Sequence, residues 1–289
     1  MSKDLTIILP AKNEANTIGL LLDQLVEKFP LATVIVVNDG SSDDTGVIAK
    51  QHGVSVISHP YCKGNGAAIK TGTRQVRTQW IATMDADGQH QAQDLMLLYK
   101  KAQQGFDMVV GARNKQGQAS IFRLMANKFY NTLASWITGH KIQDLTSGMR
   151  VVRTDCFRRF LYLFPNGFSY PTTSTMAFFR AGYSVTYQNI DVKKRVGKSH
   201  IKMFRDGARF LLIIFKVGTL YSPLKLFTPI SLVFFVLGLA YYGYTFSFYS
   251  RFTNMSALLL ITSVLIFLIG IVSEQITVLQ YSKGDVEDE

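Results

Sequence analysis

The stretch Met84–His90 reads Met-Asp-Ala-Asp-Gly-Gln-His and places two carboxylates one residue apart, directly after the apolar run Trp80–Met84. Asp85 and Asp87, at positions i and i+2 of a loop, can both point at one divalent cation. Mg²⁺ and Mn²⁺ prefer oxygen ligands and keep coordination positions open for substrate phosphates. Solvated turns also use Asp freely, so the pair alone fits a turn equally well. Its role has to be judged from the elements around it.

Short β-rich runs alternate with helical patterns through the first half of the chain. The predicted strands are Leu5–Leu9, Thr33–Val37, Val54–Ser58, Trp80–Met84 and Met108–Gly111. The predicted helices are Asn16–Phe29, Thr45–His52, Gly66–Val76 and Ala92–Gln104, followed later by helices over about 121–138 and 172–181. Such alternation with short connections predicts an α/β domain with a mostly parallel sheet and helices on both faces.

Three polar clusters each follow a predicted strand: Pro10–Glu14, Asn38–Asp44 and Asp85–Gln89. Ligands of parallel sheets bind beyond the carboxyl ends of the strands, so we expect these clusters to form one site. Asp39 can accept hydrogen bonds from the ring N–H of uracil or guanine. The run Asp43–Thr45 is expected to cap the next helix, and the first cluster is equally compatible with a helix start.

Other ligand-binding motifs fail on their spacing. Gly64–Thr71 resembles a phosphate loop, but Ile69 stands where that motif needs glycine before its Lys. No G-x-G-x-x-G follows the first strand, which argues against a dinucleotide oxidoreductase. The five His residues have no zinc-site spacing. Cys62 and Cys156 are the only cysteines, and a cytosolic domain is expected to keep both reduced.

Two long uncharged runs lie near the C-terminus, the 25 residues Leu226–Ser250 and the 22 residues Phe252–Ser273. A bilayer core needs about 20 apolar residues in a helix, so both runs are long enough to span it. Two buried core helices are the alternative, but soluble helices rarely lack charge on every face. Basic residues precede the first run and Lys283 follows the second, whereas Arg251 alone lies between them. The positive-inside rule therefore predicts a cytoplasmic N-terminal domain.

Six motifs stand in a recognisable order: Pro10–Glu14, Val37–Asp43, Asp85–Gln89, Gly111–Arg113, Asp144–Arg150 and Arg195–Ser199. Over about residues 5–200 the chain thereby resembles the family 2 glycosyltransferases of the GT-A fold. It is most similar to the polyprenyl-phosphate glycosyltransferases, the group of dolichol-phosphate mannose synthase and bacterial undecaprenyl-phosphate glucosyltransferases. Those enzymes serve the synthesis of cell envelope and other glycans.

The resemblance implies a nucleotide-sugar site lined by ten residues: Pro10, Lys12, Glu14, Val37, Asp39, Asp85, Ala86, Arg195, Lys198 and Ser199. The last three belong to a loop expected to close over the donor. Asp87 and Gln89 would hold Mg²⁺ or Mn²⁺ on the diphosphate, with Asp85 nearby. The chain departs from many relatives at His200, where they carry Lys, and at Lys12, which replaces a common aromatic residue.

Arginines are expected on the acceptor side of the site. Arg113 and Arg123 resemble those that meet phosphates near the acceptor, with Arg123 matched by spacing alone. Asp144 could orient the acceptor, or could simply form a loop turn. A lipid phosphate carries about 1.5 to 2 negative charges near neutral pH, so it needs no general base, unlike a hydroxyl group. It needs cations that offset its repulsion from the donor diphosphate.

The implied reaction is metal-dependent, inverting transfer of a sugar from a UDP-glucose-like donor or GDP-mannose to an undecaprenyl or dolichyl phosphate. Transfer to a lipid hydroxyl such as diacylglycerol is one alternative, and a non-catalytic, membrane-anchored nucleotide-binding protein is another. A processive polysaccharide synthase would need a Q-x-x-R-W motif, and neither Trp80 nor Trp136 stands in one.

The predicted organisation has three parts: a cytoplasmic catalytic domain over 1–200, a juxtamembrane amphipathic helix over 201–223, and a two-helix transmembrane hairpin with an acidic tail over 224–289. Four basic residues share one face of the amphipathic helix: Lys202, Arg205, Arg209 and Lys216. The net charge of +11 favours phosphates and membrane lipids as partners over nucleic acid, because much of it lies beside the spans. A homo-oligomer is also compatible with the sequence.

Overall fold

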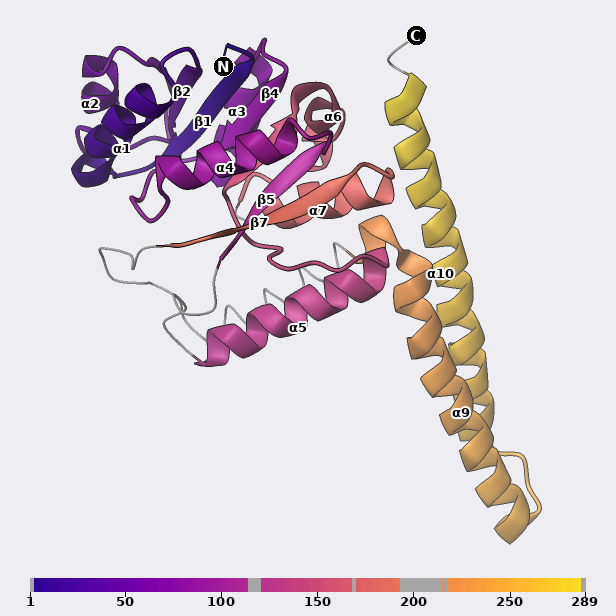
Figure 1. The fold of residues 1–289 in the computed structure, drawn as a ribbon. Helices are drawn as coiled ribbons and strands as arrows, with labels where there is room; N and C mark the ends of the chain where they lie inside the picture. The colour runs from indigo at the N-terminus through magenta and orange to yellow at the C-terminus, as the bar shows by residue number, and fades with distance from the viewer. Residues whose placement is uncertain (1–2, 114–120, 168–169, 193–214, 216–217, 287–289) are drawn as a thin grey trace. The chain divides into compact units, whose positions relative to one another are not determined.

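The computed structural model describes residues 3–113, 121–167, 170–192, 215 and 218–286, with side chains omitted for 121–127 and 281–286 (Figure 1). The chain divides into two compact units. One comprises Met1–Ser135 and His140–Ile201, and the other comprises Trp136–Gly139 and Lys202–Glu289. Most of the expected amphipathic helix over 201–223 lies outside the described residues.

The first unit is built on a seven-stranded sheet with the strand order β3-β2-β1-β4-β6-β5-β7. The strands are β1 Leu5–Ala11, β2 Thr33–Asn38, β3 Ser55–Ser58, β4 Trp80–Thr83, β5 Met108–Arg113, β6 Arg150–Arg153 and β7 Val185–Ile190. All neighbouring pairs are parallel except the two that involve β6. The predicted α/β class with a mostly parallel sheet is confirmed.

Helices cover both faces of this sheet (Figure 1). The helices up to residue 180 are α1 Ala15–Lys28, α2 Thr45–Gln51, α3 Asn65–Gln75, α4 Ala92–Ala102, α5 Ile121–Thr138, α6 Thr154–Arg159 and α7 Tyr170–Arg180. Side chains alternate along a strand, so Ile7 of β1 joins the core beneath α1 and α4 while Ile8 packs against Gly72 of α3. The predicted helices agree with these to within a few residues. The sequence patterns did not predict α6, β6 or β7.

The antiparallel strand β6 decides what lies at the carboxyl edge of the sheet. Its first residue, Arg150, pairs with Thr83 at the end of β4 and with Val110 in β5. Because β6 runs against its neighbours, the loop that enters it lies at the edge where β4 and β5 end. The segment 144–149 therefore reaches the same edge as the loops that follow the parallel strands.

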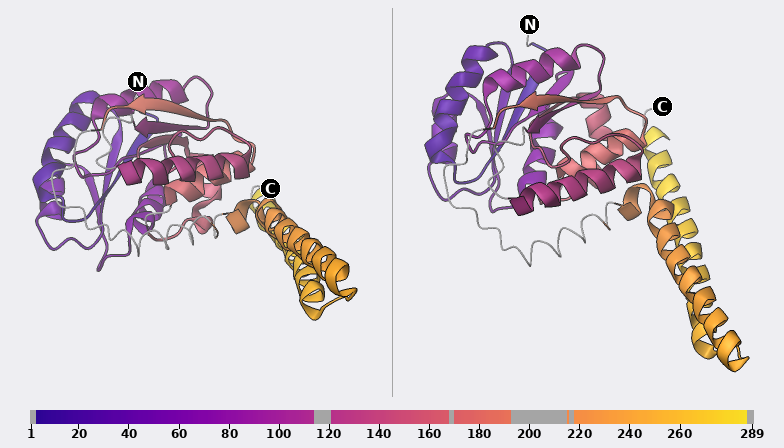
Figure 2. Two further views of the ribbon diagram at one scale, coloured as in Figure 1. Left: turned by 90° about the horizontal axis from the view of Figure 1, so that it is seen from below. Right: turned by 60° about the horizontal axis from the view of Figure 1, so that its bottom comes forward.

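The second unit contains two long antiparallel helices, α9 Pro223–Tyr249 and α10 Asn254–Val286, which lie side by side in both views of Figure 2. In each helix, a stretch of 27 residues is long and apolar enough to cross a membrane. Small buried residues recur at every seventh position along their contact: Ser231, Gly238 and Thr245 on α9, and Ser256, Ser263, Gly270 and Thr277 on α10. Such spacing keeps one face toward the partner helix, and small residues allow close approach. Accordingly, the Ser231 hydroxyl donates to the Ser263 carbonyl at 2.9 Å.

Candidate functional site

The loops after β1 and β2 are locked to each other at the carboxyl edge. The amide of Asn13 donates to the Ser41 hydroxyl at 3.0 Å, and the Asn13 side-chain oxygen accepts from the amide of Ser42 at 2.9 Å. Asp43 accepts from the amide of Ala15 at 3.1 Å and from that of Thr45 at 3.1 Å. Asn13 has a φ of 56°, a left-handed conformation that Asn tolerates better than most residues. The two loops thus form one rigid wall of the edge.

Helices do start after both loops, but the side chains that cap them are only partly those that the sequence suggested. Helix α1 begins after Glu14 and α2 begins after Asp44, but neither residue makes a side-chain capping bond. Asp43 does make one, to the amide of Thr45. The buried Thr45 hydroxyl in turn accepts from the amide of Glu14 at 2.9 Å, which ties α2 to the loop after β1.

The first turn of α1 also holds the loop that carries the D-x-D pair. The hydroxyl of Thr17 donates to the carbonyl of Ala86 at 2.8 Å. Within that loop the Asp87 carboxylate accepts from the amide of Gln89 at 3.2 Å, and Gly88 adopts a φ of 73°. A turn with left-handed φ at glycine lets Asp87 and Gln89 stand on the same short loop without strain.

Asp39 lies at the end of β2 with both carboxylate oxygens already engaged. It accepts from His59 Nδ1 at 2.7 Å, from the amides of Lys63 and Gly64 at 2.8 Å each, and from the Cys62 thiol at 3.2 Å. Burial alone would raise the pKa of Asp39, but these hydrogen bonds outweigh burial and lower it. Asp39 therefore organises the loop 59–64, and its contact with a nucleobase stays a prediction.

Lys12 belongs to the same cluster although it is exposed. The neighbouring Cys62 side chain and, to a smaller extent, the charge of Asp39 raise the pKa of Lys12. Because Cys62 also donates to Asp39, the fold brings together two of the residues that the resemblance assigned to the nucleotide. The link through Cys62 had no signal in the sequence.

Arg113 and Asp144 form a bidentate ion pair across the edge from that cluster. Arg113 Nε donates to Asp144 Oδ2 at 2.7 Å, and an Nη of Arg113 donates to Asp144 Oδ1 at 2.9 Å. Burial alone would raise the pKa of Asp144, but the hydrogen bonds and charge of Arg113 lower it below its usual value. Asp144 is therefore an ionised group that orients Arg113.

The segment around Asp144 is anchored from two further sides. Asp144 Oδ1 accepts from the amide of Thr146 at 3.1 Å, so the turn that the sequence also allowed is present. The side-chain amide of Asn131 on α5 donates to the carbonyl of Gln143 at 2.6 Å and accepts from the amide of Leu145 at 3.1 Å. Asn131 is a supporting residue that the sequence patterns gave no reason to select.

Gly148 packs against the carboxylate of Asp85. A Cβ atom at this position would lie 2.5 Å from Asp85 Oδ2, closer than real Cβ atoms approach a neighbour. The Gly148 carbonyl accepts from the Thr83 hydroxyl at 2.8 Å, which fixes the contact. Residues 85 and 148 come together only because β6 enters beside β4, so no spacing in the sequence reveals this pair.

The donor set around the D-x-D pair suits a hard divalent cation. Asp85, Asp87 and Gln89 are all half-buried on one loop and offer carboxylate and amide oxygens, the ligands that Mg²⁺ and Mn²⁺ prefer. Across the described part of the chain, no group of three or more His, Cys, Asp or Glu side chains could hold a metal ion. Two carboxylates and one amide leave coordination positions open, so these residues fit a cation that takes its remaining ligands from substrate phosphates and water.

The remaining predicted nucleotide contacts differ in how they are placed. Pro10 and Glu14 are half-buried at the edge, whereas Ala86 is buried. Val37 is fully buried, so its side chain offers no surface to a ligand here. Arg123 lies on α5 with no side chain described, and three predicted residues fall outside the described ranges: Arg195, Lys198 and Ser199.

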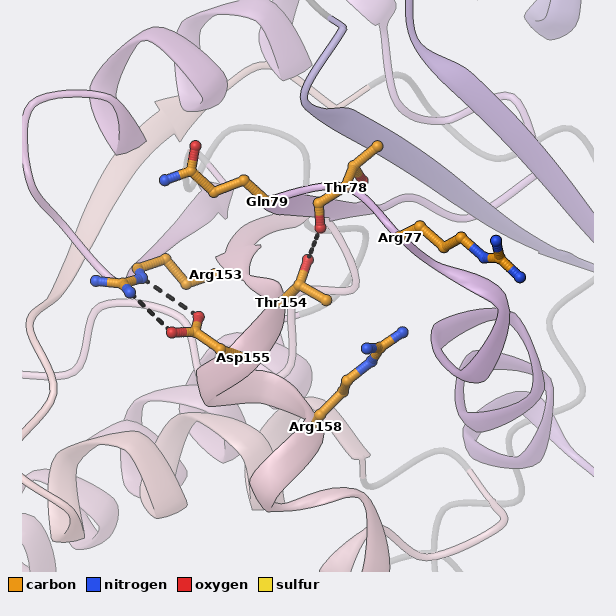
Figure 3. Close-up of a pocket in the computed structure, with 7 residues that line it drawn as sticks. All are labelled: Arg77, Thr78, Gln79, Arg153, Thr154, Asp155 and Arg158. Atoms are coloured by element: carbon orange, nitrogen blue, oxygen red, sulfur yellow. Dashed lines mark hydrogen bonds and ion pairs between the residues drawn. The ribbon is translucent and has the colours of Figure 1, made fainter. Parts of the chain in front are cut away.

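A cavity of about 320 Å³ lies at the opposite, amino edge of the sheet (Figure 3). It is lined in part by Arg77, Arg153 and Arg158, from the residues that precede β4 and those at and after the end of β6. Arg153 is paired with Asp155 at 2.8 Å, and Arg158 donates to the carbonyl of Val76 near the end of α3. This cavity is separate from the cluster at the carboxyl edge.

The model of the glycosyl transferase family 2 matches residues 6–161, which is more than half of the 289-residue chain. The chain belongs to this family. A second model, the GtrB C-terminal hairpin, matches residues 222–279 and so covers most of α9 and α10. The predicted resemblance to the family 2 glycosyltransferases is confirmed, and the protein is a glycosyltransferase of family 2.

Named relatives of the glycosyltransferase include enzymes of lipid-linked sugars. It is 33% identical to an undecaprenyl-phosphate 4-deoxy-4-formamido-L-arabinose transferase of Photorhabdus laumondii over 52% of this chain and 49% of that one, so it spans about half of that relative. It is 27% identical to a dolichyl-phosphate hexose transferase of Haloferax volcanii over 74% of this chain and 93% of that one.

Among solved structures, the glycosyltransferase is similar to glucosyl-3-phosphoglycerate synthase from Mycobacterium tuberculosis in complex with Mn²⁺, UDP-glucose and phosphoglyceric acid. The TM-score is 0.61 at 18% identity, over 74% of this chain and 79% of that one. At this identity the likeness shows the fold alone.

Proposed function

We propose that this glycosyltransferase transfers a sugar from a nucleoside diphosphate sugar to a polyprenyl phosphate, with Mg²⁺ or Mn²⁺ as its cofactor. One observation carries the proposal: the D-x-D loop and the Arg113–Asp144 pair meet at one edge of a family 2 domain. The relatives named above as undecaprenyl-phosphate and dolichyl-phosphate transferases support the acceptor class.

The donor diphosphate is proposed to lie beside Asp85, Asp87 and Gln89. A divalent cation held there supplies electrophilic stabilisation of the departing nucleoside diphosphate. Lys12 and the loop fixed by Asp39 then face the nucleoside, and either uracil or guanine is compatible with that wall. UDP-glucose-like donors and GDP-mannose are the two donor classes to compare.

Arg113 is proposed to meet the acceptor phosphate. Burial alone would lower the pKa of Arg113, but its bonds to Asp144 and the charges of Asp144 and Asp85 raise it, so the guanidinium stays cationic. Asp144 and the Thr146 hydroxyl accept from three of its five N–H groups and fix the plane of the fork, which leaves the two N–H groups of the other Nη for a phosphate oxygen. The phosphate oxygen attacks the anomeric carbon opposite the leaving diphosphate, which inverts the anomeric centre.

The acceptor proposal is favoured over a lipid hydroxyl by the state of Asp144. A hydroxyl acceptor needs a general base, and such a base works best with a pKa near the operating pH. The pKa of Asp144 is lowered by Arg113, which makes it a poor base. The two acids of the D-x-D pair, Asp85 and Asp87, are assigned to the cation, whereas a phosphate acceptor needs no base at all.

The membrane position is also part of the proposal. Helices α9 and α10 are proposed to cross the bilayer as a hairpin. The basic residues before α9 support a catalytic domain on the cytoplasmic side, by the positive-inside rule. The lipid acceptor then reaches the enzyme without leaving the bilayer.

The full-length protein in detergent tests the proposal when it is incubated with UDP-glucose or GDP-mannose, undecaprenyl phosphate, and Mn²⁺, Mg²⁺ or EDTA. Mass spectrometry should find a glycosylated lipid phosphate with one donor and a divalent cation, and no such product with EDTA. NMR of the product should show the inverted anomer. Activity on diacylglycerol but on no lipid phosphate would replace the proposal with the lipid-hydroxyl alternative.

A further inference from the structure

Arg150, the first residue of β6, is fully buried and bonds two separate parts of the chain. One Nη donates to the carbonyl of Ser147 at 2.5 Å. The other donates to the carbonyl of Pro171 at 3.0 Å and to the hydroxyl of Ser174 at 2.5 Å, both in the first turns of α7. The guanidinium is thus a clamp between the loop before β6 and helix α7.

Arg150 places a positive charge in the protein interior, which packing alone does not require. Within the described ranges, no carboxylate forms an ion pair with Arg150, and its Nε has no hydrogen-bond partner. The centre of the Tyr170 ring lies 5.7 Å from the guanidinium carbon. Burying a charge without a paired carboxylate is unfavourable, and an apolar side chain of similar volume would fill this space more stably. A role other than packing would account for an arginine here.

The loop held by Arg150 meets two functional groups of the site, the Asp85 carboxylate and the Arg113–Asp144 pair. Arg150 fixes the carbonyl of Ser147, while the hydroxyls of Thr83 and Tyr170 donate to the carbonyl of Gly148 at 2.8 and 3.4 Å. Two successive carbonyls are therefore pinned. Gly148 is the residue that packs against the Asp85 carboxylate.

The same loop carries Asp144, which orients Arg113. Only two residues separate Asp144 from Ser147, so a shift of the pinned Ser147 carbonyl is transmitted directly to the ion pair. Burial lowers the pKa of Arg150, whereas the neighbouring Tyr170 and Tyr187 and, to a smaller extent, the charges of Asp144 and Asp85 oppose that lowering.

We infer that Arg150 is a positioning residue of this site, which sets the loop 144–148 so that Gly148 supports Asp85 and Asp144 aims Arg113. The inference rests on the proposed function for what Asp85 and Arg113 do. Arg150 itself is fully buried and touches no substrate. It acts through the carbonyl of Ser147, and it requires the forked geometry of a guanidinium because one ammonium cannot reach both the loop and α7.

The test compares Arg150→Lys and Arg150→Met with Arg153→Lys and Arg153→Met in the full-length protein. Arg153 is the matched control because it lies on the same strand but is partly exposed and paired with Asp155 at 2.8 Å. Loss of an outer support of a metal site typically costs about 10- to 100-fold in affinity or activity. Per folded molecule, Arg150→Lys should lower kcat by at least about tenfold, with the Arg153 variants close to wild type.

Two readouts separate positioning from a purely structural role. In a double-mutant cycle with Arg113→Lys, the effect of Arg150→Lys on kcat should be smaller than in the wild-type background, because part of that effect is transmitted through Asp144 to Arg113. Binding of Mn²⁺ in the presence of UDP or GDP, measured by electron paramagnetic resonance, should weaken in Arg150→Lys about tenfold. The second readout needs no turnover, so it still tests Arg150 if no donor supports transfer.

Four results would overturn the inference. Full activity of Arg150→Lys would show that the fork is unnecessary. Losses of activity that only match the loss of folded protein would make Arg150 structural, and additive effects with Arg113→Lys would remove the coupling. Unchanged Mn²⁺ binding in Arg150→Lys would disconnect the loop from Asp85. By contrast, absence of transfer by the wild type with every donor would defeat the proposed function alone.

Discussion

The two halves of the carboxyl edge are held in different ways. At β1 and β2, the loops lock to each other through neutral donors, and Asp39 is satisfied by a histidine, a thiol and two amides. At β4, β6 and β5, an antiparallel strand brings in a loop that is held by charged groups, namely the Arg113–Asp144 pair and the buried Arg150. The contacts in the first half fix the conformation of the loops, whereas those in the second half fix the positions of charged side chains.

This difference predicts where substitutions affect catalysis more than stability. Carboxylates in the second half are expected to control turnover, because they place the cation and Arg113. The buried carboxylate in the first half is expected to control mainly the stability of its loop. Substitutions in the two halves therefore test whether turnover and stability are controlled by different halves.

The largest effect is expected for Asp87→Ala. Removing a cation ligand should lower turnover by more than the roughly 100-fold that loss of an outer support costs, while the unfolding temperature stays near that of the wild type. Turnover is measured with the active donor and undecaprenyl phosphate, and unfolding by circular dichroism. The control is Asp44→Ala, because Asp44 is exposed and makes no side-chain capping bond. Near-normal turnover of Asp87→Ala would show that the cation is held elsewhere.

The next largest effect is expected for Asp144→Asn. The amide cannot neutralise Arg113 or accept both of its N–H groups, so turnover should fall about 10- to 100-fold. Loss of a charged hydrogen-bonded pair should also lower the free energy of unfolding by about 2 kcal/mol. Both quantities are measured on the same preparation, by kinetics and by chemical denaturation.

The pH dependence of unfolding sharpens the assignment of Asp144. Its folded pKa lies below the usual 3.8, so its contribution to stability is present above that value and is lost as the pH falls through the folded pKa. The Asn variant should therefore lose less stability than the wild type on acidification below about pH 4. Parallel curves for the two proteins would contradict the ion pair.

The sequence predicted the first half of the edge better than the second. Strand–helix alternation and the cluster after each parallel strand depend on local patterns, and so Pro10–Glu14 and Asn38–Asp44 in the first half were placed correctly at this edge. In the second half the same pattern placed only Asp85–Gln89, after β4. The strand β6 has only four residues and begins with a charged one, Arg150. Nothing in its local composition marks it as a buried central strand.

The contacts that depend on β6 were accordingly not predicted from the sequence. Gly148 meets Asp85 and Asn131 meets the loop 143–145 only after the antiparallel pairing is known. The closure of Asp39 by Cys62 and His59 is a second case, because those partners lie more than 19 residues away along the chain. Tertiary pairing, rather than residue type, selected these groups.

A smaller effect, confined to the second half, is expected for Gly148→Ala. The added Cβ would lie 2.5 Å from Asp85 Oδ2, so the carboxylate must move. The Mn²⁺ concentration that gives half-maximal activity should rise about tenfold, a magnitude typical of a displaced support of a metal ligand. The control is Gly167→Ala, since a Cβ at Gly167 meets nothing within 4 Å. Equal metal dependence in the two variants would separate Gly148 from the cation site.

The smallest effect on catalysis is expected for Asp39→Asn in the first half. One side-chain oxygen becomes an NH₂ group that faces the amide of Gly64 or Lys63, so two donors oppose each other in a buried site. The free energy of unfolding should fall by about 2 kcal/mol, while kcat changes little with donor in excess. Asp43→Asn is the control, because the exposed Asp43 carboxylate makes its loop contacts near solvent and should lose less. A loss of kcat as large as that of Asp144→Asn would mean that Asp39 also serves the chemical step, and the contrast between the two halves of the edge would no longer hold.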